Sequence, residues 1–178
     1  MLILSFSLLP GHLYAKYYHY PGSKVTPKAG DILVTSSTVS SGIIGHAAIV
    51  VNSTEIMEIR GPGYHPKVRS ISSWFKSFKN TKVIRINNYT KAKHAAAWAK
   101  KYNRKAKYKI TSNLQSTNPT YCSKIVYQAY TKGTSGVFPK YGKGYYWPPY
   151  NFLFKRSYHP GLHPKVVYKK GHIYKGDL

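Results

Sequence analysis

The segment GHAAIVV at residues 45–51 decides the fold that we predict for this chain. It is rich in apolar and β-branched residues, as is DILVT at 31–35, and both segments are predicted to be strands. The turn residues NST at 52–54 lead into a third predicted strand, IMEI at 56–59. A fourth strand is predicted at 82–86, KVIRI. Strands this closely spaced favour a small antiparallel sheet.

Helical patterns follow these strands. Small and apolar residues at helical spacing within 91–105 predict an amphipathic helix with a lysine-rich outer face. A short helix is expected within 68–78. A third helix is predicted to start at the TNP triplet at 117–119, to continue through YCSKIVYQAY at 121–130 and to end near Gly133. The predicted class is α+β, with the sheet curled towards a half-barrel and the helix of Cys122 packed against it.

The composition limits the possible functions. The 178 residues suit one domain. There are 28 Lys and Arg against four acids, a formal net charge of +24, and only three of the basic residues precede residue 60. The electrostatic field of so positive a chain attracts polyanions, whether nucleic acid, wall polymers or anionic lipid headgroups. The few carboxylates disfavour glycosidase chemistry and calcium sites, and a single cysteine excludes disulfide frameworks and multi-cysteine zinc sites.

The chain divides into four regions by composition. Residues 1–15, MLILSFSLLPGHLYA, resemble a truncated signal peptide without its basic start, which predicts a secreted protein. Residues 16–29 are an extended lead-in, 30–160 the folded domain and 161–178 a basic C-terminal tail. No other segment is predicted to span a membrane, and anionic cell-wall polymer is the partner expected from the charge.

Cys122 lies in the first turn of its predicted helix. Backbone N–H groups and the positive end of the helix dipole favour a thiolate there, and the same groups could stabilise an oxyanion. The alternative is a buried cysteine that only fills the core, which is a common environment for free cysteines. On its position alone, the two interpretations are evenly balanced.

His46 is the one histidine placed in an apolar strand, where an unpaired imidazole would be costly to bury. It therefore needs a specific partner or a specific function. Glu58, in the next strand among apolar neighbours, could orient the ring and stabilise the imidazolium. Glu55 competes for this role, but it lies beside the turn and is expected to face solvent. The other histidines are expected in the leader, in loops or on the basic helix: His12, His19, His65, His94, His159, His163 and His172.

Taken together, the segments GDIL at 30–33, GHAAIV at 45–50, Met57-Glu58 and YCSKIVYQAY at 121–130 resemble a known family. They are similar to the circularly permuted NlpC-like branch of the papain-fold cysteine hydrolases, the YiiX/YycO-like group, in which the histidine strand precedes the cysteine helix. The resemblance covers roughly residues 28–155. It implies a papain-like fold and a catalytic triad of Cys122, His46 and Glu58. The strong positive charge is not a general trait of that family.

The resemblance implies a thiol hydrolase that needs neither metal nor cofactor. Its first expected substrate is an amide bond in a peptidoglycan peptide, cleaved through a thioester intermediate. Acyl-ester or acyl-amide hydrolysis on lipids is the alternative, since permuted relatives similar to lecithin retinol acyltransferase process lipids. A basic wall-binding module without activity is the rival from another class. Asp31 and Gly45 are expected to be structural, and Tyr121 either packs or contacts substrate.

Overall fold

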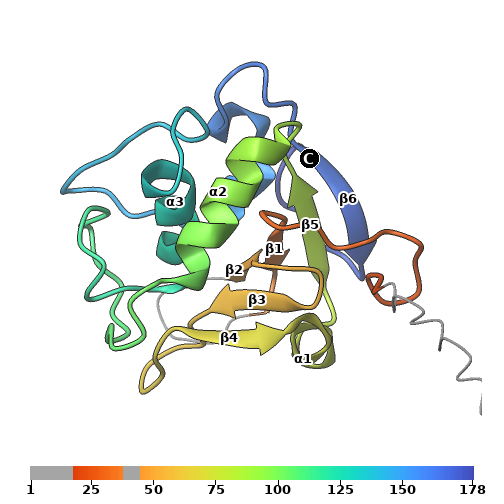
Figure 1. Cartoon of the computed structure of the whole chain (residues 1–178), viewed down its shortest axis with the longest axis horizontal. Coiled ribbons are helices and arrows are strands. Elements are labelled where there is room, and N and C mark those ends of the chain that lie inside the picture. The colour runs from red at the N-terminus through yellow and green to blue at the C-terminus, as the bar shows by residue number, and fades with distance from the viewer. Residues whose placement is uncertain (1–17, 38–44) are drawn as a thin grey trace, which may run out of the picture.

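The computed structural model describes residues 18–37 and 45–178 and shows a mixed α+β fold around one antiparallel sheet (Figure 1). The predicted leader at 1–15 lies outside the described residues. The six strands run in the order β4-β3-β2-β1-β5-β6, so the sheet is open, with β4 and β6 at its edges. The strands are β1 (Ile32–Thr35), β2 (His46–Val50), β3 (Glu55–Glu58), β4 (Lys67–Ser70), β5 (Thr81–Arg85) and β6 (Lys165–Lys170). The helices in the described part are α1 (Ile71–Ser77), α2 (Tyr89–Lys100) and α3 (Cys122–Lys132), with 3-10 turns η1 (Pro149–Leu153) and η2 (Lys155–Ser157).

The central strands are apolar on both faces because both faces of the sheet are covered. Ile32 of β1 pairs with Ile49 of β2 on one side and with Ile84 of β5 on the other. Every residue of β1 and β2 is buried. Side chains alternate between the faces along each strand, so each strand contributes to two separate cores.

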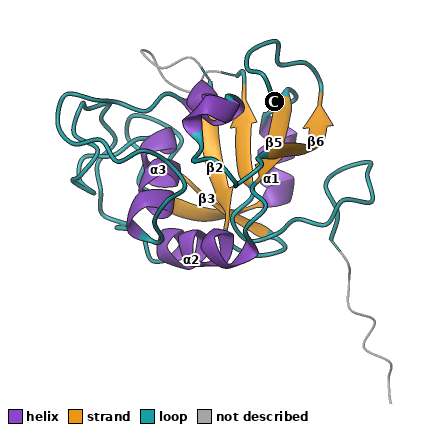
Figure 2. Cartoon of the chain, turned by 90° about the horizontal axis from the view of Figure 1, so that it is seen from above, coloured by secondary structure: helices purple, strands orange, loops and turns teal. Residues whose placement is uncertain are grey.

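The two cores differ in the helices that close them. One contains Ile32 and Ile49 together with the buried sides of α2 and α3. The other contains Leu33, Ala48 and the aromatic residues of α1 and its end. Figure 2 shows α2 and α3 together on one side of the sheet. The sheet is therefore the middle layer, and α3 approaches it from the face opposite α1.

The four strands expected from the sequence are all present, with ends shifted by about one residue. The two edge strands, β4 and β6, were not predicted. Their residues are only partly buried, and their basic side chains weaken the apolar pattern that marks a strand. Strand β6 lies within the predicted basic tail at 161–178, and its residues pair with β5, so this part of the tail is in the sheet.

Both long helices differ from the prediction at one end. Helix α2 stops at Lys100 rather than 105, and the chain then turns through 101–106. Helix α3 starts at Cys122, not at Thr117. The segment before it is held extended, because the N–H of Thr120 bonds to the carbonyl of Lys107 and its carbonyl accepts from the N–H of Lys109, both at 2.9 Å. Cys122 is thus the first residue of its helix.

Candidate active site

His46 and Glu58 come together on one face of the sheet, the face covered by α1. His46 is the first residue of β2 and Glu58 the last of β3, and the two strands are antiparallel neighbours. By alternation, their side chains share the face of Ala48 and Ile56. The Nε2 atom of His46 lies 2.7 Å from Oε2 of Glu58, with both side chains fully buried. The carboxylate therefore fixes the orientation of the ring.

Two arginines hold the other oxygen of Glu58. Nε of Arg60 donates to Oε1 at 3.1 Å, and Nε of Arg69 forms an ion pair with the same atom at 3.1 Å. Burial raises the pKa of Glu58, but the hydrogen bond and charge of His46, followed by those of Arg60, outweigh it and leave that pKa below its usual value. Glu58 is thus a buried carboxylate in its ionised form, shared between an imidazole and two guanidinium groups.

Cys122 reaches His46 from the opposite face of the sheet. Its helix packs with Ala47 and Ile49, and the contact with His46 forms at the end of the sheet where β2 begins. The N-cap residue, Tyr121, gives no side-chain cap to the helix. The backbone N–H groups of Ala47 and Ser123 instead help to lower the pKa of Cys122. Cys122 thus lies at a helix start, where backbone N–H groups and the helix dipole favour negative charge.

The charges of Cys122 and His46 stabilise each other. Burial raises the pKa of the Cys122 thiol, but the charge and hydrogen bond of His46 and the two backbone N–H groups lower it below the usual thiol value. Burial likewise lowers the pKa of His46, but interactions with Cys122 and then with Glu58 raise it to about 9. The Nδ1 atom of His46 is buried without a hydrogen-bond partner among the described residues, and Cys122 and Glu58 are the ionisable groups that raise the pKa of the ring. Each group thereby favours the charged form of the other, the thiolate beside the imidazolium.

An aromatic wall holds the imidazole from the side of α1. The ring of Trp74 stacks on that of His46 with centroids 5.2 Å apart and an angle of 19°, and Phe78 lies at 5.3 Å. Nε1 of Trp74 donates to the hydroxyl of Thr81 at 3.1 Å, which fixes the indole. An aromatic face next to an imidazolium favours its charged form.

The sequence did not identify these surrounding groups as parts of the site. Arg60 follows Glu58 by two residues in an extended chain, and side chains two residues apart in such a chain lie on the same face. This spacing could have placed Arg60 near Oε1 of Glu58. Arg69 lies on β4, an edge strand whose pairing with β3 was not predicted. Trp74 was expected only in a short helix, and its contact with His46 is set by how α1 folds back onto the sheet.

A loop is tied to both neighbours of Cys122. The hydroxyl of Ser123 donates to the carbonyl of Trp147 at 2.6 Å, and the N–H of Trp147 donates to the hydroxyl of Tyr121 at 2.9 Å. Tyr121 is fully buried, so it packs and positions this loop. Gly45, which precedes His46, has φ +87°, and a Cβ there would lie 2.8 Å from the carbonyl oxygen of Thr35. Glycine is therefore needed at that position.

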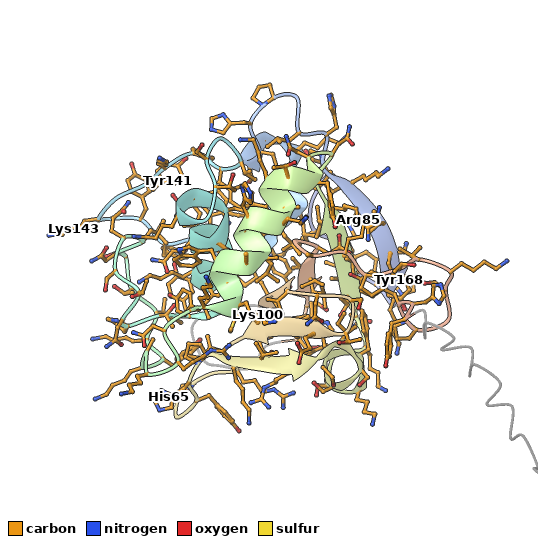
Figure 3. The ribbon with its side chains drawn as sticks, viewed as in Figure 1. His65, Arg85, Lys100, Tyr141, Lys143 and Tyr168 are labelled. Atoms are coloured by element: carbon orange, nitrogen blue, oxygen red, sulfur yellow. The ribbon has the colours of Figure 1, made fainter. Side chains whose placement is uncertain are left out.

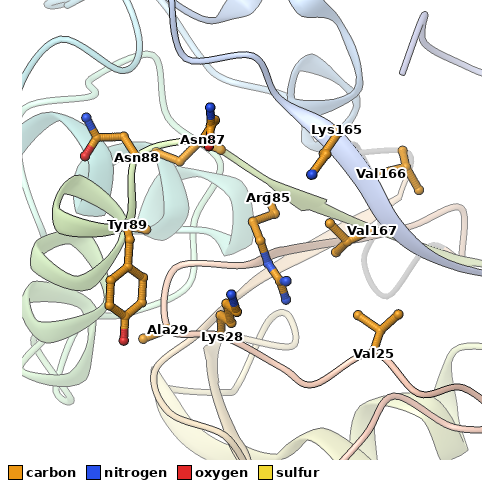
Figure 4. A pocket seen from close by; sticks show the side chains of 12 residues that line it. Val25, Lys28, Ala29, Arg85, Asn87, Asn88, Tyr89, Lys165, Val166 and Val167 are labelled. Atoms are coloured by element: carbon orange, nitrogen blue, oxygen red, sulfur yellow. The ribbon is translucent and has the colours of Figure 1, made fainter.

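Asp31 has a structural position away from the triad. Its buried carboxylate accepts from the hydroxyl of Tyr20 at 2.7 Å and from two nitrogens of Arg85, each at 2.7 Å. Arg85 also lines a cavity of about 510 Å³ with residues that include Lys28 and Tyr89 (Figure 4). The residues around this cavity do not include the triad.

The remaining acids and histidines do not join the triad. Glu55 is partly exposed and accepts from the side-chain amide of Asn52 at 2.6 Å, in the turn before β3. The six described histidines other than His46 are exposed: His19, His65, His94, His159, His163 and His172. Within 18–37 and 45–178, no three His, Cys, Asp or Glu side chains group to hold a metal ion. None of the described helices is long and apolar enough to cross a bilayer.

Comparison with known proteins places the chain in a family. The sequence model of the lipoprotein N-acylation protein LnsA-like family matches residues 1–151, and the chain belongs to that family. This family is distinct from the permuted NlpC-like hydrolases that the motifs resemble, so cysteine hydrolysis stays a prediction. The chain is also 35% identical over 140 residues to an uncharacterized 30.3 kDa protein of Bacillus thuringiensis, across 66% of this chain and 52% of the relative. It thus spans about half the length of that relative. No solved structure matches the chain, and the papain-like fold also stays a prediction.

Proposed function

We propose that this LnsA-like protein is a thiol acyltransferase that moves an acyl group from a lipid ester to the amino group of a lipoprotein. The observation that carries the proposal is the buried array of Cys122, His46 and Glu58 at the start of α3. Lipoprotein N-acylation, the process for which the family is described, joins an acyl group to an amine. A thioester on a cysteine is a suitable intermediate, because it separates the transfer into two easier steps.

In the first step the thiolate of Cys122 attacks the carbonyl carbon of the ester. A carbon–sulfur bond forms, the carbon–oxygen bond breaks, and His46 gives its proton to the departing alcohol. Glu58 stabilises the imidazolium before this transfer and keeps the ring in place through its 2.7 Å contact. Backbone N–H groups in the first turn of α3 are the donors available to the developing oxyanion.

In the second step a neutral amine attacks the thioester carbonyl. The carbon–nitrogen bond forms, the carbon–sulfur bond breaks, and His46 accepts the proton that the amine loses. The thiolate and the imidazolium are thereby restored. Cys122 is 2% exposed and His46 is fully buried, which limits the contact of the thioester with bulk water.

The test supplies both substrates and follows both products. The protein is incubated with a diacyl phospholipid and a lipopeptide that carries a free N-terminal amine, and the products are identified by mass spectrometry. We expect N-acyl lipopeptide from the wild type and none from Cys122→Ala. Free fatty acid without N-acyl product would assign lipid hydrolysis instead. Release of peptides from purified peptidoglycan would assign the wall-peptide cleavage that the sequence resemblance implies.

A further inference from the structure

One loop beside the candidate active site exposes aromatic rings, although hydrogen bonds hold its backbone in place. In the segment 139–147, called here the aromatic loop, Tyr145 is 55% exposed and Tyr146 56%. Tyr141 stacks on Tyr145 with ring centroids 4.6 Å apart. By contrast, Trp147 at the end of the loop is buried. The packing of the domain therefore does not account for the two exposed rings.

Hydrogen bonds from the rest of the fold fix this loop. The hydroxyl of Tyr127 donates to the carbonyl of Pro139 at 2.9 Å and accepts from the N–H of Tyr141 at 2.7 Å. Further along, the N–H of Tyr145 donates to the carbonyl of Ser112 at 3.0 Å. The backbone of the loop is thus held in place before any partner binds, which lowers the entropic cost of binding.

The same surface is positively charged. Lys140 and Lys143 are exposed on the aromatic loop, and Arg156 lines a hollow of about 320 Å³ together with tyrosines of the loop. Figure 3 shows Lys143 at the outer tip of the loop, beyond α3. The sequence contains no acidic residue between Glu58 and Asp177, so no carboxylate within the loop offsets these charges.

We propose that the aromatic loop docks on the surface of an anionic phospholipid bilayer. Tyrosine suits this position because its ring enters the interfacial region while its hydroxyl stays hydrated. Lysines beside the rings add attraction to anionic headgroups, which strengthens binding by about fivefold for each lysine near the surface. The choice of a bilayer over other polyanions rests on the proposed function, in which the acyl donor is a lipid.

Docking at this loop would place the nucleophile next to the membrane. The loop ends at Trp147, whose backbone is bonded to both neighbours of Cys122. Just after it, the ring of Tyr150 lies beside Gly45, which precedes His46. A lipid ester at the membrane surface would then face the side of the protein on which Cys122 and His46 lie.

The experiment measures binding to vesicles by co-sedimentation. Vesicles of equal parts phosphatidylglycerol and phosphatidylcholine are compared with vesicles of phosphatidylcholine alone. We expect the wild type to prefer the anionic vesicles, and Lys140→Gln/Lys143→Gln to bind them about 25-fold more weakly. Tyr146→Ser, at an exposed position, is expected to bind them about tenfold more weakly.

A matched control separates the loop from the overall charge. Lys100→Gln/Lys105→Gln removes the same charge from exposed positions at and after the end of α2 and is expected to bind nearly as well as the wild type. Equal weakening of vesicle binding in the two double variants would overturn the proposal. It would also be overturned if the loop variants kept vesicle binding but lost binding to wall polymer or duplex DNA. Cys122→Ser is expected to bind vesicles like the wild type. Its binding therefore reports on docking even if the proposed acyl transfer fails.

Discussion

Replacing Glu58 by Gln isolates the effect of its charge on the triad. Gln can still accept a hydrogen bond from Nε2 of His46, so the ring keeps its position while the negative charge is lost. A hydrogen bond to an ionised group is roughly twice as strong as a neutral one, a difference of about 1–2 kcal/mol here. The imidazolium loses that stabilisation, which lowers the pKa of His46 from about 9 towards its ordinary value.

This loss has a measurable consequence at Cys122. The population of the thiolate–imidazolium pair depends on the imidazolium, so we expect alkylation of Cys122 by iodoacetamide near neutral pH to slow by about five- to thirtyfold. Acyl transfer is expected to slow by at least as much. The fold should tolerate the change, because Arg60 and Arg69 are 30% and 24% exposed and can be solvated in the variant.

Glu55→Gln is the matched control. It removes the same charge from the same strand, at a partly exposed carboxylate that accepts from the amide of Asn52. We expect wild-type alkylation rates from this variant across the pH range. Equal slowing in both variants, or unchanged reactivity in Glu58→Gln with intact folding, would refute the role assigned to Glu58.

Three further predictions concern pH and stability. Alkylation of Cys122 should reach its maximum rate at a lower pH than alkylation of an ordinary thiol, whereas acyl transfer should decline as pH rises through about 9 and His46 loses its proton. The raised pKa of His46 also stabilises the fold at pH values below about 6.5, the pKa of histidine in the unfolded chain. That contribution is lost as pH rises through about 9, and urea denaturation at a series of pH values measures the loss. Trp74→Leu should cost about 3 kcal/mol in thermal unfolding and slow alkylation, while Trp74→Phe should retain most of the reactivity. Asp31→Asn should lower the free energy of unfolding by about 3 kcal/mol, measured by urea denaturation, because it leaves the mostly buried Arg85 without its charge partner. The control Asp177→Asn, at an exposed position, should lower it by less than about 1 kcal/mol. Equal losses in the two variants would contradict the structural role of Asp31.

Local patterns in the sequence were enough to predict the centre of the fold. The four predicted strands have continuous apolar character because both faces of the sheet are covered there. The same apolar context singled out His46 and Glu58, since polar groups in a buried strand need partners. The structure brings these two residues together with Cys122, and their catalytic roles stay predictions.

The features that the sequence did not reveal depend on contacts between distant segments. Strand β6 is basic and only partly buried, so its pairing with β5 had no local pattern to indicate it. The start of α3 was misplaced because Thr120 is held extended by residues 107–109, a contact across about a dozen positions. Trp147 contacts the neighbours of Cys122 from 24 and 26 positions away, and no spacing in the sequence encodes such a contact.

The central claim is that Cys122 carries the acyl group. It is tested most directly by peptide mapping of the protein after incubation with phospholipid alone, without an amine acceptor. We predict an acyl adduct on Cys122 of the wild type, released by hydroxylamine as a thioester should be and missing from Cys122→Ala. An unmodified Cys122 in a folded protein that is supplied with lipid, or the same adduct in Cys122→Ala, would contradict the account.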